Sequence, residues 1–134
     1  MKVYLDTNVL VSAFTARGLC ADLVRYLLAE HDVMTGEVNL VELRRVLADY
    51  FHASDQQLAM VEGLLRDQVI VPRPATPSRL PLRDDDDARV LASAVEGAAD
   101  LLVTGDKDLL SVAARAPLPI LSPREAWERL RHVK

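Results

Sequence analysis

The sequence predicts an α/β fold, a three-layer α/β/α sandwich around a central parallel sheet of four to five strands. Short, almost wholly apolar runs of strand type alternate along the chain with longer runs of helical periodicity. The strand-like runs lack the apolar–polar alternation of a sheet with one solvated face, so helices are expected on both faces. With 134 residues, half of them hydrophobic, the chain is expected to form one domain, 1–134.

The first part of the chain is expected to supply two strands and two helices. The run KVYL (2–5) predicts a strand that ends abruptly at Asp6, and NVLVSAFT (8–15) begins a helix. Segment 19–32 places leucines and a tyrosine at helical spacing, and DVMT (32–35) predicts the second strand.

The middle of the chain predicts two further helices and a proline-rich connection. Segment 37–51 carries apolar residues at helical spacing, Val41 and Tyr50 among them, and 54–67 begins with a serine at the N-cap position. Segment 69–83 holds four of the seven prolines. We expect a short extended piece there, followed by an ordered connector and not by a domain boundary.

The last part of the chain continues the alternation of helices and strands. Its terminal helix has the clearest start, because Ser122 and Glu125 predict a capping box with Pro123 at the first helical position. The expected elements are a helix at 86–99, a buried strand at 100–104, a short helix at 106–116, a strand at 119–121 and a helix at 122–133.

Charge and cysteine content narrow the class of protein. A net charge of −4 argues against sequence-blind binding of nucleic acid through a basic surface, although divalent cations can bridge carboxylates to phosphate. The single cysteine, Cys20, cannot form an internal disulfide and is best explained as a small, buried apolar residue. We expect a cytoplasmic protein, since there is no basic-then-apolar leader and no run long enough to span a bilayer.

Four acidic residues occupy positions that point to a site. Asp6 directly follows the first strand and Asp106 follows the strand at 100–104, and ligands of parallel sheets bind at the carboxyl ends of strands. Glu42 lies within an apolar helical stretch. Asp87 has apolar residues three and four positions later, which places it on the buried face of its helix.

Each acid also has a purely structural explanation. Asp6 suits a turn or an N-cap, and Glu42 suits the half-exposed flank of a helix. Asp106 and Asp108 could simply begin a helix. In the run DDDD (84–87), all but the last residue can be explained by helix capping and the helix dipole.

As a group, the acids indicate a cation site. Several carboxylates at one edge of one sheet would repel one another strongly without a cation between them. Oxygen ligands without cysteine or histidine are typical of Mg²⁺ or Mn²⁺ sites.

The segments VYLDTNVLVSAF, LVELRRVL, DDDDARVLASA and LLVTGDKDLL resemble the PIN-domain family in order and spacing. The resemblance covers nearly the whole chain and is closest to the VapC-like toxin components of toxin–antitoxin pairs. It implies a Rossmann-like fold, a ribonuclease that depends on Mg²⁺ or Mn²⁺, a homodimer and an antitoxin partner. The helical segments 19–30 and 37–66 are candidates for the dimer face.

The resemblance also implies roles for individual residues. The chain departs from the family at Asp85, where relatives often have proline, and at Gly36, where they often have serine, and neither change removes a required acid. Catalytic and metal-binding roles fall on Asp6, Glu42, Asp87 and Asp106, with Asn8, Thr104 and Asp108 as supporting residues.

The implied chemistry is hydrolysis of an RNA phosphodiester by one or two bound cations. The cation activates a water molecule and neutralises charge on the phosphate, while Glu42 ligates the ion or orients the water. Basic side chains would contact flanking phosphates, although scattered basic residues are more often plain surface. The candidates are Arg17, Arg44, Arg83 and Lys107.

Two other classes of function remain open at this point. One is a PIN-like binding module with little or no activity that acts through a protein partner. The other is a phosphatase of the haloacid-dehalogenase type, which needs a second aspartate where this chain has Asn8 and a lysine before GDKD that is missing here. The sequence does not specify the RNA target or the number of ions.

Overall fold

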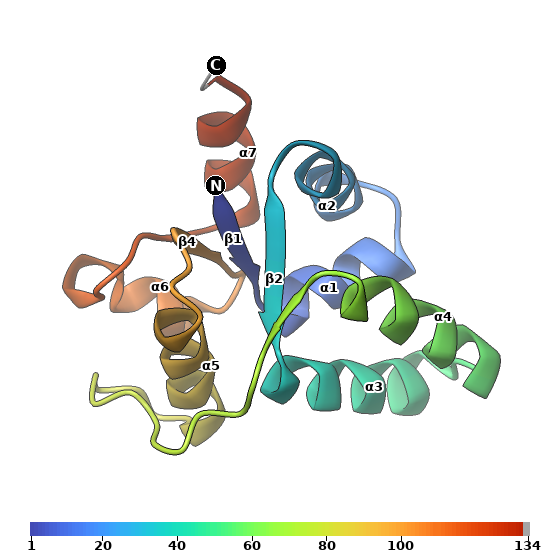
Figure 1. The fold of residues 1–134 in the computed structure, drawn as a ribbon, viewed down its shortest axis with the longest axis horizontal. Coiled ribbons are helices and arrows are strands. Elements are labelled where there is room, and N and C mark those ends of the chain that lie inside the picture. Colours follow the sequence, from blue (N-terminus) through green and yellow to red (C-terminus); the bar gives the residue numbers. More distant parts are fainter. Residues whose placement is uncertain (133–134) are drawn as a thin grey trace.

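The computed structural model describes residues 1–132, and its centre is a parallel five-stranded sheet in the order β3-β2-β1-β4-β5 (Figure 1). All four strand pairs are parallel, which confirms the predicted sheet. The strands are β1 (Lys2–Leu5), β2 (Asp32–Gly36), β3 (Val69–Val71), β4 (Leu101–Val103) and β5 (Ile120–Leu121).

Helices cover both faces of the sheet, as predicted. Because successive strand residues point to opposite faces, Val3 and Leu5 of β1 pack into one core and Tyr4 packs into the other. The first core is closed by α1 (Thr7–Thr15), α2 (Leu19–Glu30), α3 (Glu37–Phe51), α4 (Asp55–Arg66) and α7 (Pro123–His132), and the second by α5 (Asp85–Glu96) and α6 (Lys107–Ser111).

Most helix ends lie where the sequence predicts them. Ser54 and Gln57 form a capping box at the start of α4, and Ser122 and Glu125 exchange the same pair of hydrogen bonds at the start of α7. Val133, the last residue of the expected terminal helix, lies outside the described residues.

The single helix expected at 106–116 is wrong. The α-helix α6 ends at Ser111, and a separate 3-10 turn, η1, spans Ala113–Arg115. The break falls at Val112, whose backbone N–H bonds to carbonyl groups of α6 while its side chain is buried in the second core. The chain tightens here from α-helical to 3-10 geometry, since the Val112 N–H donates to the Leu109 carbonyl three residues earlier at 3.2 Å.

The apolar residues of α3 do not all face the core. Leu40, Leu43 and Leu47 are buried, whereas Val41 and Tyr50 are 67% and 70% exposed. Only one stripe of a helix can face a core, so a segment with apolar residues all around must expose some of them.

The connector between β3 and α5 contains no helix or strand but is fastened to the protein. Ser78 N donates to the Ala88 carbonyl at 2.9 Å, and Arg89 Nη1 donates to the Pro74 carbonyl at 3.0 Å. It is therefore the ordered connector that the sequence predicts. Among the described residues, no helix combines the length and apolarity needed to cross a bilayer.

Candidate active site

The residues that follow the paired strands β1 and β4 lie next to each other at the same edge of the sheet. Leu5 of β1 lies opposite Val103 of β4, and the Asp6 backbone N–H donates to the Val103 carbonyl at 3.0 Å. The chain runs from β1 to β2 on one side, whereas β4 lies on the other, so the strand order reverses here. Open α/β sheets bind ligands at such a switch point.

Asp6 is 5% exposed and accepts four hydrogen bonds. Its Oδ1 accepts from the Thr7 backbone N–H at 2.8 Å and from Asn39 Nδ2 at 3.0 Å. Its Oδ2 accepts from Thr104 Oγ1 at 2.7 Å and from Asn8 Nδ2 at 3.2 Å. Asp6 is thus the N-cap of α1, which confirms the structural explanation, and also the centre of a buried polar network. Its catalytic role stays a prediction.

Burial raises the pKa of the Asp6 carboxyl, and the nearby charge of Asp106 raises it further. Hydrogen bonds from Thr104, Thr7 and Asn8 act in the opposite direction because they favour the ionised form. A carboxyl held between these opposing effects interacts strongly with any cation that reaches it.

Asn8 and Thr104 tie the ends of β1 and β4 together. Asn8 Oδ1 accepts from the Gly105 backbone N–H at 2.8 Å, and Thr104 Oγ1 accepts from the Asp106 backbone N–H at 3.0 Å. Both residues therefore orient Asp6 and the start of the Asp106 loop. Their supporting role in a reaction stays a prediction.

A buried network of polar side chains, none of which was predicted as a site residue, extends from the core to Asp6. Asn39, with no exposed surface, donates to Asp6 and to Thr7 Oγ1 and accepts from the Tyr4 hydroxyl. The Tyr4 hydroxyl is also bonded to Ser93 Oγ at 2.7 Å. Since the phenol has one proton and gives it to Asn39, the Ser93 hydroxyl supplies the proton of this bond.

Two sequence features are tied to this buried polar network: the position of Asn39 and the glycine at position 36. Asn39 precedes Leu43 by four residues and Leu47 by eight, so it is a polar residue on the buried face of α3. A Cβ atom at Gly36 would collide with Tyr4 Oη and Ser93 Oγ. Glycine therefore stands at this position because the tyrosine hydroxyl occupies the space of a side chain.

Three carboxylates gather beside Asp6. One oxygen from each of Asp87, Asp106 and Asp108 lies within 4.8 Å of the others, and all three residues are half-buried. Asp106 uses Oδ1 to cap α6, accepting from the backbone N–H groups of Asp108 and Leu109 at 2.8 and 3.2 Å. Capping explains part of its role but leaves Oδ2 without a hydrogen bond among the described residues.

Neighbouring carboxylates repel the charge of Asp87. Burial first, and then the charges of neighbouring aspartates, together raise the pKa of the Asp87 carboxyl to about 7. Removing these charges from water and from one another's field is costly unless a cation joins them. The neighbours responsible are, in order, Asp106, Asp84, Asp6 and Asp108.

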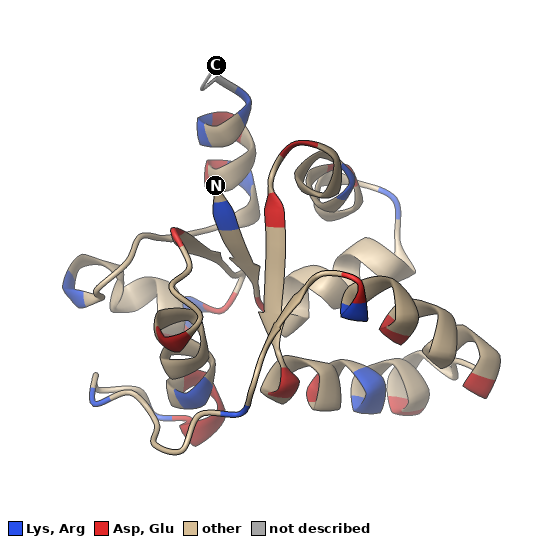
Figure 2. Ribbon diagram, viewed as in Figure 1, with Lys and Arg blue, Asp and Glu red and all other residues tan. Residues whose placement is uncertain are grey.

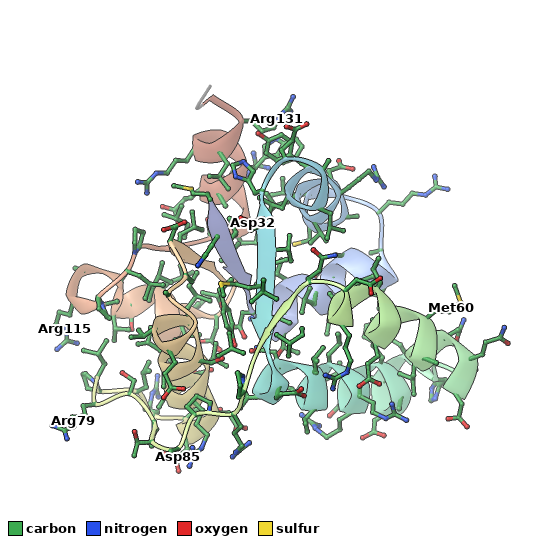
Figure 3. All side chains as sticks on the ribbon, viewed as in Figure 1. Asp32, Met60, Arg79, Asp85, Arg115 and Arg131 are labelled. Atoms are coloured by element: carbon green, nitrogen blue, oxygen red, sulfur yellow. The ribbon has the colours of Figure 1, made fainter. Side chains whose placement is uncertain are left out.

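Within the run 84–87, one residue faces this cluster. Asp84 is the N-cap of α5, accepting from the Asp86 backbone N–H at 2.8 Å, and Asp85 is exposed and points away from the protein (Figure 3). Acidic positions crowd the N-terminal end of α5 (Figure 2), but in the described chain only Asp87 of this run belongs to the carboxylate cluster.

Glu42 is not brought into the cluster. It is half-exposed on α3 and lines a small pocket between α3 and α5. Burial raises the pKa of the Glu42 carboxyl, followed by the charges of Asp6 and Asp86, whereas Arg45 lowers it. Glu42 therefore feels the site electrostatically, and its role as a ligand stays a prediction.

The donor set of this site suits a hard divalent cation. Three carboxylates with free oxygen atoms and a fourth, buried carboxylate provide charge and oxygen ligands. Asp108, predicted only as a supporting residue, lies in the cluster itself, and Asp6 lies beside it. The residues present fit the predicted Mg²⁺ or Mn²⁺.

The fold and this acidic edge define an α/β protein with a candidate cation site at the switch point of its sheet. A family model for the PIN domain matches residues 2–108. The chain therefore belongs to the PIN-domain family, which leaves the phosphatase alternative without support. No curated protein sequence matches it significantly.

Several solved structures share the fold of this chain. VapBC2 from Rickettsia felis, bound to a DNA fragment from their promoter, aligns with a TM-score of 0.66 at 17% identity, over 91% of this chain and 98% of that chain. FitAB bound to the IR36 DNA fragment aligns with a TM-score of 0.67 at 17% identity, over 90% of this chain and 94% of that chain. FitAcB from Neisseria gonorrhoeae aligns with a TM-score of 0.63 at 16% identity, over 91% of this chain and 98% of that chain.

Proposed function

We propose that the chain is a single-domain endoribonuclease, dependent on Mg²⁺ or Mn²⁺, and the toxin of a toxin–antitoxin pair in the cytosol. The observation that carries this proposal is the gathering of Asp87, Asp106 and Asp108 next to buried Asp6, at the edge where parallel sheets bind ligands. Membership of the PIN-domain family supports it.

Each acid has a separate task in the proposed reaction. Asp87, Asp106 and Asp108 hold the ion, and Asp6, fixed by four hydrogen bonds, adds a rigid negative charge beside them. Glu42, on the side of the adjoining pocket, orients a water or completes the ligand set. A divalent cation held there would supply Lewis-acid activation of water and neutralise charge on the phosphate.

A pair of variants from one run of aspartates tests the nuclease. Asp87→Asn removes a charge from the cluster, whereas Asp85→Asn removes the same charge from an exposed position. Cleavage of a labelled RNA with Mn²⁺ should fall at least about 100-fold in the first variant and stay unchanged in the second. Equal activity of Asp87→Asn and the wild type would refute the assignment, as would cleavage that persists in EDTA.

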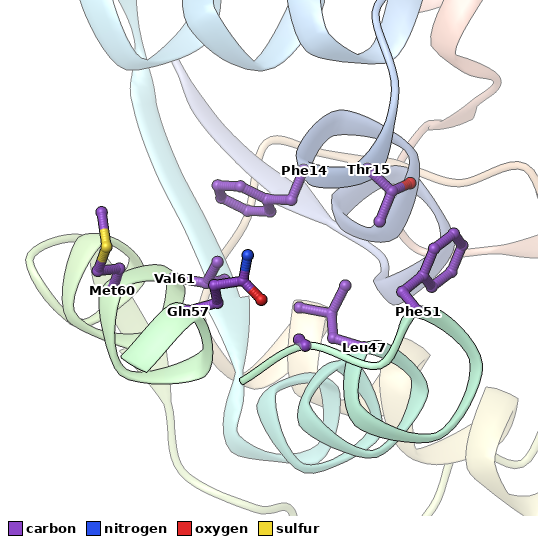
Figure 4. Close-up of a pocket in the computed structure, with 8 residues that line it drawn as sticks. Phe14, Thr15, Leu47, Phe51, Gln57, Met60 and Val61 are labelled. Carbon is purple, nitrogen blue, oxygen red and sulfur yellow. The ribbon is translucent and has the colours of Figure 1, made fainter. Parts of the chain in front are cut away.

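An apolar groove supports the part of the proposal that concerns a protein partner. Between α1, α3 and α4 lies a groove of about 370 Å³ surrounded by Phe14, Leu47, Phe51 and Val61 (Figure 4). Exposed apolar side chains continue from it along α3 and α4, including Tyr50, Met60 and Leu64. Patches of this kind mark interaction sites.

We assign this groove to the antitoxin and not to the proposed homodimer. An apolar groove between helices is a common binding site for the apolar face of an amphipathic segment from another protein. Co-purification with the protein of the neighbouring reading frame should be lost in Phe51→Arg while RNA cleavage is kept. Mass measurement by light scattering on the same variant should still give a dimer. Loss of the dimer with an intact complex would reverse the assignment.

The groove is also the observation that favours the second candidate, a PIN-fold binding module with little activity. The two functions differ in their response to metal. A binding module would bind its partner equally well in EDTA and would cleave no RNA when Mn²⁺ is titrated in.

A further inference from the structure

The pocket between α3 and α5 has a composition that the carboxylate cluster does not explain. It has a volume of about 130 Å³ and is lined by Glu42, which lies outside the carboxylate cluster but close enough to feel the charge of Asp6. On α3, Val38, Glu42 and Arg45 follow one another at spacings of four and three residues and share one face of the helix. The opposite wall comes from Asp86 and Val90 of α5, and Arg73, two residues after β3, closes the pocket.

The two arginines in this pocket differ from their neighbours. Arg44, the residue before Arg45, pairs with Glu62 at 3.2 Å, and Arg83 pairs with Asp108 at 3.4 Å. Arg45 and Arg73 take part in no ion pair or hydrogen bond within the described part of the chain. Two of the four predicted phosphate-binding residues, Arg44 and Arg83, are therefore held in ion pairs. Arg45 and Arg73, which the sequence did not single out, have no such partner within the described residues.

Unpaired guanidinium groups next to a cation site suit a polyanion. Guanidinium binds phosphate oxygens in a bidentate manner, more specifically than an ammonium group does. The pocket has a volume of about 130 Å³, which gives room for a phosphate group. Two acids, Glu42 and Asp86, share the pocket, and a cation bound at the carboxylate cluster would offset part of their charge.

We propose that Arg45 and Arg73 bind the backbone phosphate that flanks the scissile phosphate of an RNA substrate. This inference rests on the proposed nuclease function. The contact is made to the backbone, so it fixes the position of the strand without reading its sequence. It gives an acidic protein a local way to hold RNA that its net charge does not provide.

The test compares Arg45→Ala and Arg73→Ala with two matched controls. Arg44→Ala alters the adjacent residue of the same helix, and Arg79→Ala alters an arginine of the same connector that points away from the protein (Figure 3). Binding of a fluorescein-labelled, mixed-sequence single-stranded RNA is measured by anisotropy over a range of salt, with Ca²⁺ in place of Mn²⁺ to keep the RNA intact. Cleavage kinetics are then measured with Mn²⁺.

The expected result is specific to the two pocket arginines. Each pocket variant should reduce the slope of log K against log salt by about 0.7, the value for one phosphate contact on a single strand. The KM for RNA should rise on the order of tenfold with kcat unchanged, because a contact to a non-reacting phosphate contributes uniform binding. A dinucleotide that contains only the scissile phosphate should be cleaved equally by all variants.

Other outcomes would overturn the proposal. Unchanged slope and KM in Arg45→Ala and Arg73→Ala would show that the pocket holds no phosphate, and equal losses in the two controls would reduce the effect to general surface charge. If wild-type protein cleaves no RNA, the nuclease function fails, and the binding slopes alone then decide whether the pocket binds a phosphate.

Discussion

Replacing Asn39 by leucine removes three buried hydrogen bonds while keeping the branching and the number of heavy atoms of the side chain. The bond to the Asp6 carboxylate is charge-assisted and worth roughly 1.5–3 kcal/mol, and the bonds with Thr7 and Tyr4 contribute about 1 kcal/mol each. We therefore expect the free energy of unfolding to fall by roughly 4 kcal/mol. Asp6 also loses a donor that favours its ionised form, so its pKa, already raised by burial, should rise further.

The affinity of the site for a cation distinguishes a positioning role of Asn39 from a simple loss of stability in the variant. Partners that orient a metal-binding group typically change metal affinity by about 10–100-fold, so Mn²⁺ affinity measured by calorimetry should fall within that range. Unfolding in urea, followed by circular dichroism, gives the stability of the same sample. Asn39→Ser, which is small and polar, replaces the leucine variant if the latter does not fold.

Ser93→Ala is the matched control for this experiment. Ser93 is equally buried and bonded to Tyr4, but does not touch Asp6. It should lose about 1 kcal/mol of stability and keep wild-type Mn²⁺ affinity. Wild-type affinity in folded Asn39→Leu, or an equal loss of affinity in Ser93→Ala, would refute the view that Asn39 positions the Asp6 carboxylate.

Three further predictions follow from the same geometry. Gly36→Ala should destabilise the protein by roughly 1–3 kcal/mol in urea unfolding, because its Cβ meets Tyr4 Oη and Ser93 Oγ, and Tyr4→Phe should recover part of this loss; additive effects would argue against the collision. In EDTA the folded-state pKa of Asp87 is about 7, above its unfolded value of 3.8, so unfolding free energy should fall as pH rises from about 4 to about 7. The decline should be on the order of 1 kcal/mol after solvent screening, and Asp87→Asn should flatten it; an equal slope in both proteins would exclude Asp87 as its source. Mn²⁺ at 100 times its Kd should increase the free energy of unfolding by about 2.7 kcal/mol, which is measured as a rise in Tm. The Asp85→Asn variant should show this rise and the Asp87→Asn variant should not; the same rise in Asp87→Asn would place the ion elsewhere.

Features with a local cause were correctly predicted from the sequence. The parallel sheet follows from the alternation of apolar strands with helices, and the starts of α4 and α7 follow from capping boxes that span three residues. The inward position of Asp87 follows from its spacing to Val90 and Leu91 on one helix. Each of these depends on neighbours in the chain, which the sequence displays directly.

Only the tertiary structure decided which polar groups meet. The hydrogen bonds between Thr104 and Asp6 and between Tyr4 and Ser93 join residues 98 and 89 positions apart. They exist because β1 lies between β2 and β4 with α5 across one face. The entry of Asp108 into the cluster and the separation of Glu42 from it have the same origin. The sequence by itself determined the sheet and the acidic residues. Their arrangement depends on strand order and helix packing, where contacts between distant segments outweigh any local preference.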